Sequence, residues 1–153
     1  MNVRELIIDS RSILTGSRAF YCSNNESDWD FVVTLELWLQ IKKNIDYAKC
    51  IRTDNEGVNY DIGIFGEYLY DIVKYYDNNG EMINLFIFND LGTVYKFEQI
   101  NRYMLMFDDI DSKPHRIYHW IQAMSIFEIS RKNKYISIDD AESILGRGFK
   151  IVH

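Results

Sequence analysis

Two aspartates one residue apart, placed inside an apolar segment, constrain the fold of this chain more than any other feature. Asp28 and Asp30 flank Trp29, and the apolar residues 31–33 follow directly. Apolar residues recur at every second position, which favours a β-strand over a helix. In a strand, residues two apart point to the same face. We therefore expect both carboxylates to project together from one strand of a sheet.

The two faces of this predicted strand differ in character. Val32 lies below the two aspartates on their face. The opposite face is filled by Trp29, Phe31, Val33 and Leu35. Carboxylates about 7 Å apart on one strand face cannot both stay ionised at low cost unless cations lie between them. Two Mg²⁺ ions about 3.5–4 Å apart meet this requirement and can orient a triphosphate and neutralise a leaving pyrophosphate. Asp28 and Asp30 are therefore predicted as catalytic residues and metal ligands.

A second motif precedes the aspartates. A short apolar segment, 12–15, ends in Gly16-Ser17, and Arg18 follows. Glycine lets the backbone approach a phosphate closely. The Ser17 hydroxyl and neighbouring N–H groups can donate to phosphate oxygens, and Arg18 can add a charged fork. We predict that Gly16, Ser17 and Arg18 bind nucleotide phosphates. The alternative is a surface turn followed by an edge strand with two solvated aspartates.

Composition limits the class of protein. The chain has 153 residues, 47% of them hydrophobic, which predicts one folded domain with its own core. Its net charge of −6 disfavours non-specific nucleic-acid binding. No apolar run approaches the roughly 18 residues of a membrane helix, and the N-terminus, which carries Glu5, lacks the apolar segment of a signal peptide. We expect a cytoplasmic protein without membrane contact, in which Cys22 and Cys50 are free thiols.

Hydrophobic periodicity predicts the order of helices and strands. The predicted strands are 12–15, 31–35, a hairpin within 50–65, and 82–88. The predicted helices are 2–9, 67–76, 94–107, one that Pro114 opens, and a short one near 137–145. Residues 36–47 are ambiguous, with a spacing that suggests a helix. This order predicts an α+β fold, a small mixed β-sheet followed by a helical C-terminal half. We treat 1–153 as one domain, with an α/β part over about 1–90 and a helical part over about 91–153.

Gly16-Ser17 followed by Asp28-Trp29-Asp30 resembles the signature of the DNA polymerase β-like nucleotidyltransferases, especially their minimal single-domain members. That signature is an apolar strand ending in Gly-Ser or Gly-Gly, a short spacer, and Asp-x-Asp in a second apolar strand. Together with the apolar segment 83–90 before a helix, the pattern also resembles small phage-encoded nucleotidyltransferase-like proteins, over roughly 13–127. The resemblance implies a mixed sheet of the nucleotidyltransferase type. For a phage-encoded protein it implies the host cytoplasm.

The family supplies a third carboxylate from a later strand, and two positions compete for this role. Asn84 lies on the predicted strand 82–88, where the family's third strand is expected. Its carbonyl can ligate a cation but adds no charge. Asp61 lies on an earlier predicted strand and is a true carboxylate. We favour Asp61 as the third catalytic group and keep Asn84 as the alternative metal ligand.

The resemblance implies metal-dependent transfer of a nucleoside monophosphate from an NTP to an acceptor hydroxyl, with Mg²⁺ or Mn²⁺ as cofactor. The acceptor is a protein, an RNA such as tRNA, or a small molecule. On this hypothesis the two aspartates bind the metal ions, the Gly-Ser turn holds the triphosphate, and Asp61 or Asn84 completes the site. The alternative is a catalytically degenerate nucleotidyltransferase fold that binds a nucleotide or a protein without turnover.

Two further groups of residues have weaker functional interpretations. His115 and His119 lie four apart on a predicted helix, a spacing that can bind a metal. No Glu follows His115, so the zinc-protease motif is absent, and two histidines on a partly exposed helix face are the favoured interpretation. A basic C-terminal group can contact acceptor phosphates, although an ordinary solvated surface is favoured. Its members are Arg131, Lys132, Lys134, Arg147 and Lys150.

Overall fold

The computed structural model describes residues 1–52 and 69–129. Its strands are β1 Ser12–Thr15, β2 Trp29–Thr34, β3 Ile51–Arg52, β4 Leu69–Tyr76 and β5 Met82–Phe88. They form one five-stranded sheet in the order β1-β2-β5-β4-β3. In this sheet β2 and β5 run parallel, while the other neighbouring pairs are antiparallel. The sheet is therefore mixed, with its parallel pair enclosed by antiparallel neighbours.

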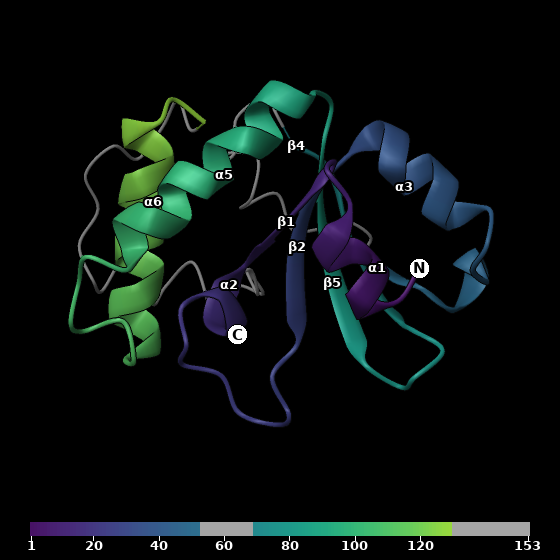
Figure 1. Cartoon of the computed structure of the whole chain (residues 1–153), viewed down its shortest axis with the longest axis horizontal. Helices are drawn as coiled ribbons and strands as arrows, with labels where there is room; N and C mark the ends of the chain where they lie inside the picture. Colours follow the sequence, from purple (N-terminus) through teal and green to yellow (C-terminus); the bar gives the residue numbers. More distant parts are fainter. Residues whose placement is uncertain (53–68, 130–153) are drawn as a thin grey trace.

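Helices cover both faces of the sheet. In the described residues they are α1 Val3–Ile8, α2 Gly16–Ala19, α3 Leu35–Lys42, the 3-10 helix η1 Tyr47–Lys49, α5 Leu91–Met104 and α6 Lys113–Ile126. Figure 1 shows α1 and α3 to the right of β2, and α5 and α6 to its left. The apolar side chains agree with this view, because one buried cluster joins the sheet to α1 and α3 and another joins it to α5 and α6.

Side chains at the helix starts explain where the helices begin. Asn2 caps α1 and exchanges hydrogen bonds with Glu5, which forms a capping box. Thr34, the last residue of β2, accepts a hydrogen bond from the backbone of α3 at 3.1 Å. Asp90 caps α5 in the same way. Pro114 lies in the first turn of α6, where its missing N–H is harmless, as the sequence predicts.

The two central strands are buried on both faces. Val32 of β2 and Phe86 of β5 belong to the apolar cluster beneath α5 and α6. Phe31 and Leu85, the neighbouring residues in sequence, belong to the cluster beneath α1 and α3. All four side chains are fully buried. The alternation predicted for the second strand is therefore present.

The helix predicted over 67–76 is wrong, because Leu69–Tyr76 is strand β4. It pairs antiparallel with β5 through the turn 77–80, in which Gly80 has a φ of +80°. Ile72 and Val73 are both buried, on opposite faces of the sheet. A strand buried on both faces has a continuous apolar run, and periodicity alone cannot distinguish such a run from a helix.

The predicted α+β class is confirmed, since the mixed sheet is followed by the long helices α5 and α6. The strands predicted at 12–15 and 82–88 are present, and the ambiguous segment 36–47 begins with most of α3. The hairpin turn expected within 50–65 and the helix expected near 137–145 lie outside the described residues. None of the helices in the described ranges has the length and apolar character needed to cross a membrane.

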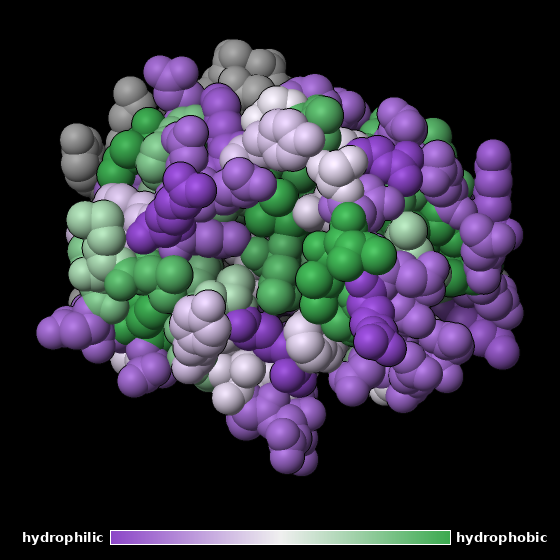
Figure 2. All heavy atoms as spheres, viewed as in Figure 1, coloured by the Kyte–Doolittle hydropathy of each residue, from purple (hydrophilic) through white to green (hydrophobic). Residues whose placement is uncertain are grey.

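The surface is mixed in polarity. Figure 2 shows apolar side chains over α1 and on the side of α5 and α6, with polar side chains between and around them. Ile7 and Ile8 are the exposed large apolar residues of α1, and Leu105 and Met106 follow α5. Scattered exposed apolar side chains are usual on protein surfaces. These residues therefore support no functional assignment.

Candidate functional site

Polar residues lie in one row across four neighbouring strands. Thr15 of β1 is opposite Asp30 of β2. Asn84 of β5 lies next, opposite Asp30 on one side and opposite Lys74 of β4 on the other. Directly opposite residues share a face of the sheet, and here it is the face beneath α5 and α6, because Val32 lies on it. We call Thr15, Asp30, Asn84 and Lys74 the polar row; β1 ends at this row, and β2 and β5 begin there.

At the centre of the polar row, Asp30 and Asn84 are fully buried and hydrogen-bonded to each other. Nδ2 of Asn84 donates to Oδ1 of Asp30 at 3.1 Å. A carboxylate accepts hydrogen bonds, so the amide presents its nitrogen to Asp30. Within the described residues, the amide oxygen of Asn84 is buried without a hydrogen-bond partner. Asn84 therefore offers Asp30 a donor, whereas a shared cation would need its oxygen.

Asp28 extends the site toward solvent. It precedes β2, and its Oδ2 lies 2.9 Å from Nζ of Lys74. The two side chains are 20% and 15% exposed, respectively, so this ion pair is screened less than one at the open surface. Among the described residues, the ammonium of Lys74 is the cationic group in contact with Asp28. Asp28 therefore already has a counter-ion at the solvent side of the site.

Gly16 allows the Gly-Ser turn to pack directly on Asp30. Its φ of +71° belongs to the left-handed region that favours glycine. A Cβ at this position would collide with Oδ2 of Asp30. Any side chain here would therefore strain the backbone and displace the carboxylate. The two sequence motifs, separated by a polar loop, meet at this contact.

The residues after Gly16 differ in how their polar groups are used. Ser17 is buried, and in the described part of the chain its hydroxyl has no hydrogen-bond partner. Such a group costs about 1–3 kcal/mol, which a ligand oxygen could offset. Arg18 contacts the loop between α2 and β2: Nη2 donates to the carbonyl of Ser27 at 2.8 Å, and the guanidinium carbon lies 4.1 Å from the ring centroid of Trp29. Arg18 thus holds the loop that ends at Asp28.

One amide connects α5 to the polar row. Oγ1 of Thr15 donates to Oδ1 of Asn101 at 2.9 Å. Nδ2 of Asn101 donates to the carbonyl of Leu14 at 2.7 Å. Both ends of the amide are used, so Asn101 fixes the helix against the end of β1. Sequence reasoning gave no role to this contact, because no local pattern relates residues 86 positions apart.

The structure brings most of the predicted site residues together. Gly16, Asp28, Asp30 and Asn84 lie at the polar row or in contact with it, and Ser17 follows Gly16 directly. Arg18 lies beside them with its guanidinium on the loop. Asp61, predicted as the third catalytic carboxylate, lies outside the described residues.

Lys74 is a charged residue of the site that sequence reasoning missed. The predicted helix over 67–76 hides the face that Lys74 shares with Ile72 in the sheet. Interpreted as a strand, the same segment has a charged residue on a face that is otherwise apolar. Its position next to the hairpin turn 77–80 would then have placed it near the start of β5.

The carboxylates of the site that belong to the described residues are suited to one cation and too few for two. Among the described residues there is no group of three or more Asp, Glu, His or Cys side chains that could hold a metal. Mg²⁺ commonly binds through one or two protein carboxylates when waters and substrate phosphates supply the other ligands. Asp28 and Asp30 are two such carboxylates, and they suit a Mg²⁺ ion that is already bound to the phosphates of a nucleotide. Two ions about 3.5–4 Å apart need more negative ligands than these two and the neutral Asn84 supply.

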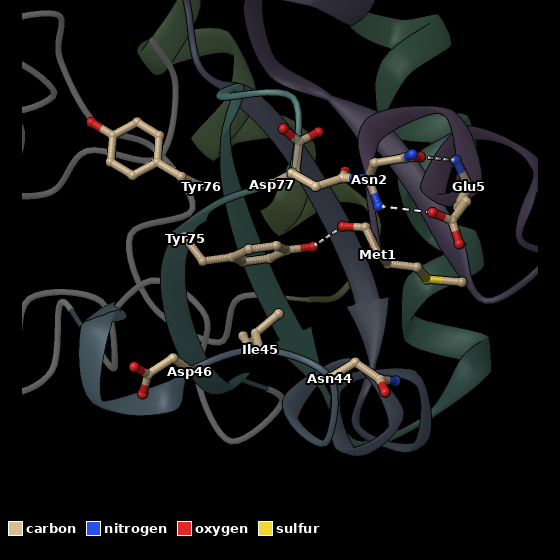
Figure 3. Close-up of a pocket in the computed structure, with 10 residues that line it drawn as sticks. Met1, Asn2, Glu5, Asn44, Ile45, Asp46, Tyr75, Tyr76 and Asp77 are labelled. Carbon is tan, nitrogen blue, oxygen red and sulfur yellow. Dashed lines mark hydrogen bonds between the residues drawn. The ribbon is translucent and has the colours of Figure 1, made fainter.

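A pocket of about 390 Å³ lies elsewhere, beside the N-terminus. Figure 3 shows Tyr75 directed to Met1, whose carbonyl accepts a hydrogen bond from Oη at 2.7 Å. Burial raises the pKa of Tyr75, so the phenol keeps its proton. Asp77 accepts hydrogen bonds from the backbone of Val3, Asn79 and Glu81. The polar groups of this pocket thus serve to join α1 to the β4–β5 turn, and among the described residues no predicted site residue lines it.

The two histidines of α6 contact different partners. Nε2 of His119 lies 2.8 Å from Oδ1 of Asp109, and its ring stacks on Phe107 with centroids 3.7 Å apart. Nδ1 of His115 lies 2.8 Å from the hydroxyl of Ser112. The two rings therefore do not converge on a common ligand. This arrangement agrees with the favoured interpretation, two histidines on a helix face.

The cysteines are free thiols, as predicted. Burial raises the pKa of both Cys22 and Cys50, so both stay protonated near neutral pH. The sulfur of Cys22 also accepts a hydrogen bond from Nη1 of Arg116 at 3.5 Å. Neither thiol has the lowered pKa that a nucleophile requires.

Comparison of the whole chain with protein-family models, with curated proteins and with solved structures gives no match. The functional argument therefore rests on the polar row and on the residues that contact it.

Proposed function

We propose that the chain is a nucleotide-binding module of the nucleotidyltransferase type, which holds a nucleoside triphosphate with one Mg²⁺ and does not transfer its monophosphate. The observation that carries this proposal is the hydrogen bond from Asn84 to Asp30. The resemblance leads one to expect a third carboxylate at this position. The chain instead has the neutral amide of Asn84, whose nitrogen faces Asp30. Among the described residues, the groups suited to phosphate and metal binding are present, and a third carboxylate suited to transfer is not.

Several groups support the binding of a magnesium–triphosphate. Asp28 is partly exposed, and together with Asp30 it supplies two carboxylate ligands. The Mg²⁺ of the nucleotide supplies the positive charge that lets two carboxylates and a triphosphate share one site. Ser17 offers a hydroxyl that has no hydrogen-bond partner among the described residues, and Gly16 holds this turn directly against Asp30. These residues bind and orient the phosphates without a chemical step.

Transfer makes a further demand on the site. An acceptor hydroxyl must lose its proton while negative charge develops on the leaving pyrophosphate. Among the described residues, the polar row holds one carboxylate, Asp30, and the neighbouring Asp28 is engaged by Lys74. A neutral Asn84 neither accepts the proton nor holds a second cation strongly. The described groups therefore support binding better than turnover.

Metal-dependent transfer to an acceptor hydroxyl on a protein, a tRNA or a small molecule is the second candidate function. It is favoured by the meeting of Gly16 with Asp30, the contact that joins the two motifs. Its third carboxylate would be Asp61, which lies outside the described residues. Both functions use the nucleoside triphosphates of the cytoplasm, the location that we propose for the chain.

Binding and transfer are separated by two measurements on the full chain. Calorimetric titration with each of the four Mg–NTPs reports binding, and α-labelled NTPs with Mg²⁺ or Mn²⁺ report transfer to protein, tRNA and small-molecule acceptors. We expect binding without labelled product, and loss of binding in Asp30→Asn. The matched control is Asp46→Asn, an exposed aspartate that pairs with Lys49, which should bind as the wild type does.

Labelled product in the wild type would overturn the proposal. If that product disappears in Asp61→Asn, the second candidate is correct and its third ligand is identified. Absence of binding to every Mg–NTP would reject both candidates. Loss of binding in Asp46→Asn to the same extent as in Asp30→Asn would reject the site, because the effect would then not depend on the polar row.

A further inference from the structure

We infer that Lys74 serves the nucleotide site in two ways: it neutralises Asp28 when no metal is bound, and it moves to a phosphate oxygen when a magnesium–nucleotide binds. This inference rests on the proposed function. It assigns a role to a residue outside both sequence motifs. The observation behind it is the ion pair of 2.9 Å between Nζ of Lys74 and Oδ2 of Asp28.

The position of Lys74 limits what its ammonium can reach. The residue lies on β4, opposite Asn84, on the face beneath α5 and α6. Ile72, on the same face of the same strand, is buried in the apolar cluster there. The aliphatic part of the Lys74 side chain is largely buried as well, and its ammonium lies at the solvent side of the site, where it contacts Asp28. An anion bound beside Asp28 would be within reach of the same ammonium.

Charge decides which partner Lys74 takes. A divalent cation held by Asp28 and Asp30 repels an ammonium that contacts the same carboxylate. A metal ion alone must therefore displace Lys74 and offers no anion in exchange. A metal-bound triphosphate brings phosphate oxygens, which accept strong charge-assisted hydrogen bonds from an ammonium. Lys74 thus opposes the binding of the free metal ion and favours the binding of the metal–nucleotide.

These opposite effects distinguish the inference from a structural role. Lys74→Met keeps the length and the apolar stem of the side chain and removes its charge. Loss of a competitor should strengthen the binding of Mn²⁺ alone, whereas loss of a phosphate partner should weaken the binding of ATP. If Lys74 only stabilised the fold, both affinities would move in the same direction or not at all.

The test uses the full chain, with Mn²⁺ binding measured by electron paramagnetic resonance and Mg–ATP binding measured by calorimetry. In Lys74→Met we expect Mn²⁺ to bind about threefold more tightly or better, in keeping with a partly exposed ion pair. We expect Mg–ATP to bind about tenfold more weakly or worse, in keeping with loss of a charged hydrogen bond. Lys74→Arg, which keeps the charge, should retain most of the ATP affinity.

Lys49→Met is the matched control. Lys49 also pairs with an aspartate, Asp46, at 3.9 Å, but lies on η1 with an 83% exposed side chain. Neither affinity should change in this variant. A similar change in Lys49→Met would show that net charge, and not the polar row, governs both titrations, and would overturn the inference.

The outcomes separate this inference from the proposed function. Unchanged ATP affinity in Lys74→Met overturns the phosphate role of Lys74 and leaves the proposed function intact. If the wild type binds no nucleotide, the proposed function fails and the phosphate role fails with it. The Mn²⁺ titration then still decides the counter-ion role, since unchanged Mn²⁺ affinity overturns it. If Lys74→Met does not fold, as judged by circular dichroism, Lys74→Gln takes its place in both titrations.

Discussion

The two faces of the sheet differ in what they bury. Beneath α1 and α3 the central strands present an apolar face, with Phe31, Val33 and Leu85 fully buried. Beneath α5 and α6 the same strands begin with buried Asp30 and Asn84 and become apolar two residues later. Buried polar groups cost free energy unless they are hydrogen-bonded. The hydrogen bond from Asn84 to Asp30 offsets part of this cost, but the amide oxygen of Asn84 has no partner among the described residues, so the second face gives up stability at the end where the site lies.

The difference shows how a strand separates stability from function. Phe31 and Asp30 are neighbours in sequence and are both fully buried, yet they face opposite layers of the molecule. Because side chains alternate between faces, a change on one face leaves the contacts of the other nearly intact. Substitutions on the two faces should therefore affect stability and binding in different proportions.

The largest expected loss of stability lies on the apolar face. Phe31→Ala removes a fully buried ring from the cluster beneath α1 and α3, which should lower the free energy of unfolding by about 3–5 kcal/mol. Urea denaturation measures this loss. Below the unfolding transition, Mg–ATP affinity should stay close to that of the wild type. A large loss of affinity in the folded variant would show that the two faces are not independent.

The next effect concerns the contact between the two motifs. Gly16→Ala places a Cβ against Asp30 in a left-handed backbone, and we expect a loss of about 2–4 kcal/mol from strain and overpacking together. Gly80→Ala is the matched control, with a φ of +80° and no heavy atom within 4 Å of the new Cβ. It should lose only about 1–2 kcal/mol. Equal losses in denaturant titrations would mean that Asp30 moves aside freely.

Asn84→Asp should convert the polar row into a site that depends on metal. A second buried carboxylate beside Asp30 should lower stability by about 1–3 kcal/mol without divalent ions. Mn²⁺ should restore the melting temperature, and transfer from α-labelled NTPs should appear or rise. Asn84→Leu, similar in size and uncharged, should show no recovery with Mn²⁺. The same melting temperature for Asn84→Asp with and without Mn²⁺ would contradict this prediction.

The smallest effect lies before the start of β1, whose other end reaches the polar row. Hydrogen bonds from the Arg11 side chain lower the pKa of Asp9. A lowered pKa means that the pair stabilises the fold above the pKa of the unfolded state and that this contribution is lost as pH falls through the folded pKa. Asp9→Asn should therefore cost about 1 kcal/mol or less at pH 7.

The pH dependence of that loss gives the measurement. Denaturation of the wild type and of Asp9→Asn should give curves that differ at pH 7 and converge as the solution becomes acidic. Nucleotide affinity should be the same in both proteins. A difference in stability that widens in acid would have the wrong sign and would reject the assignment of the shift to Arg11.

The elements that could be predicted from sequence are those with one polar face or a clear cap. The second strand was predictable because Asp28 and Asp30 alternate with apolar residues, and α6 because Pro114 opens it. β4 was not predictable in this way. Ile72 and Val73 are buried on opposite faces, so the apolar residues of this strand do not alternate with polar ones. The error on β4 also concealed Lys74 as a site residue.

The site was predictable in its local motifs and not in its long-range contacts. Gly16 and Asp30 were named from their spacing, and they are in contact. The orientation of the Asn84 amide, the reach of Lys74 and the bridge made by Asn101 all depend on which strands become neighbours. Strand order is set by packing of the whole chain, and a local pattern does not contain it.

The position of β5 between β2 and β4 also has a consequence for the order of folding. The β4–β5 hairpin is closed by the short turn 77–80, whereas Asp30 and Asn84 meet across 54 positions. Contacts between distant segments form late, because closing a long loop costs entropy before it gains contacts. The polar row therefore comes into existence when the hairpin docks on β2. A nucleotide that recognises the row should leave the earlier steps of refolding unchanged and slow the unfolding of the docked chain.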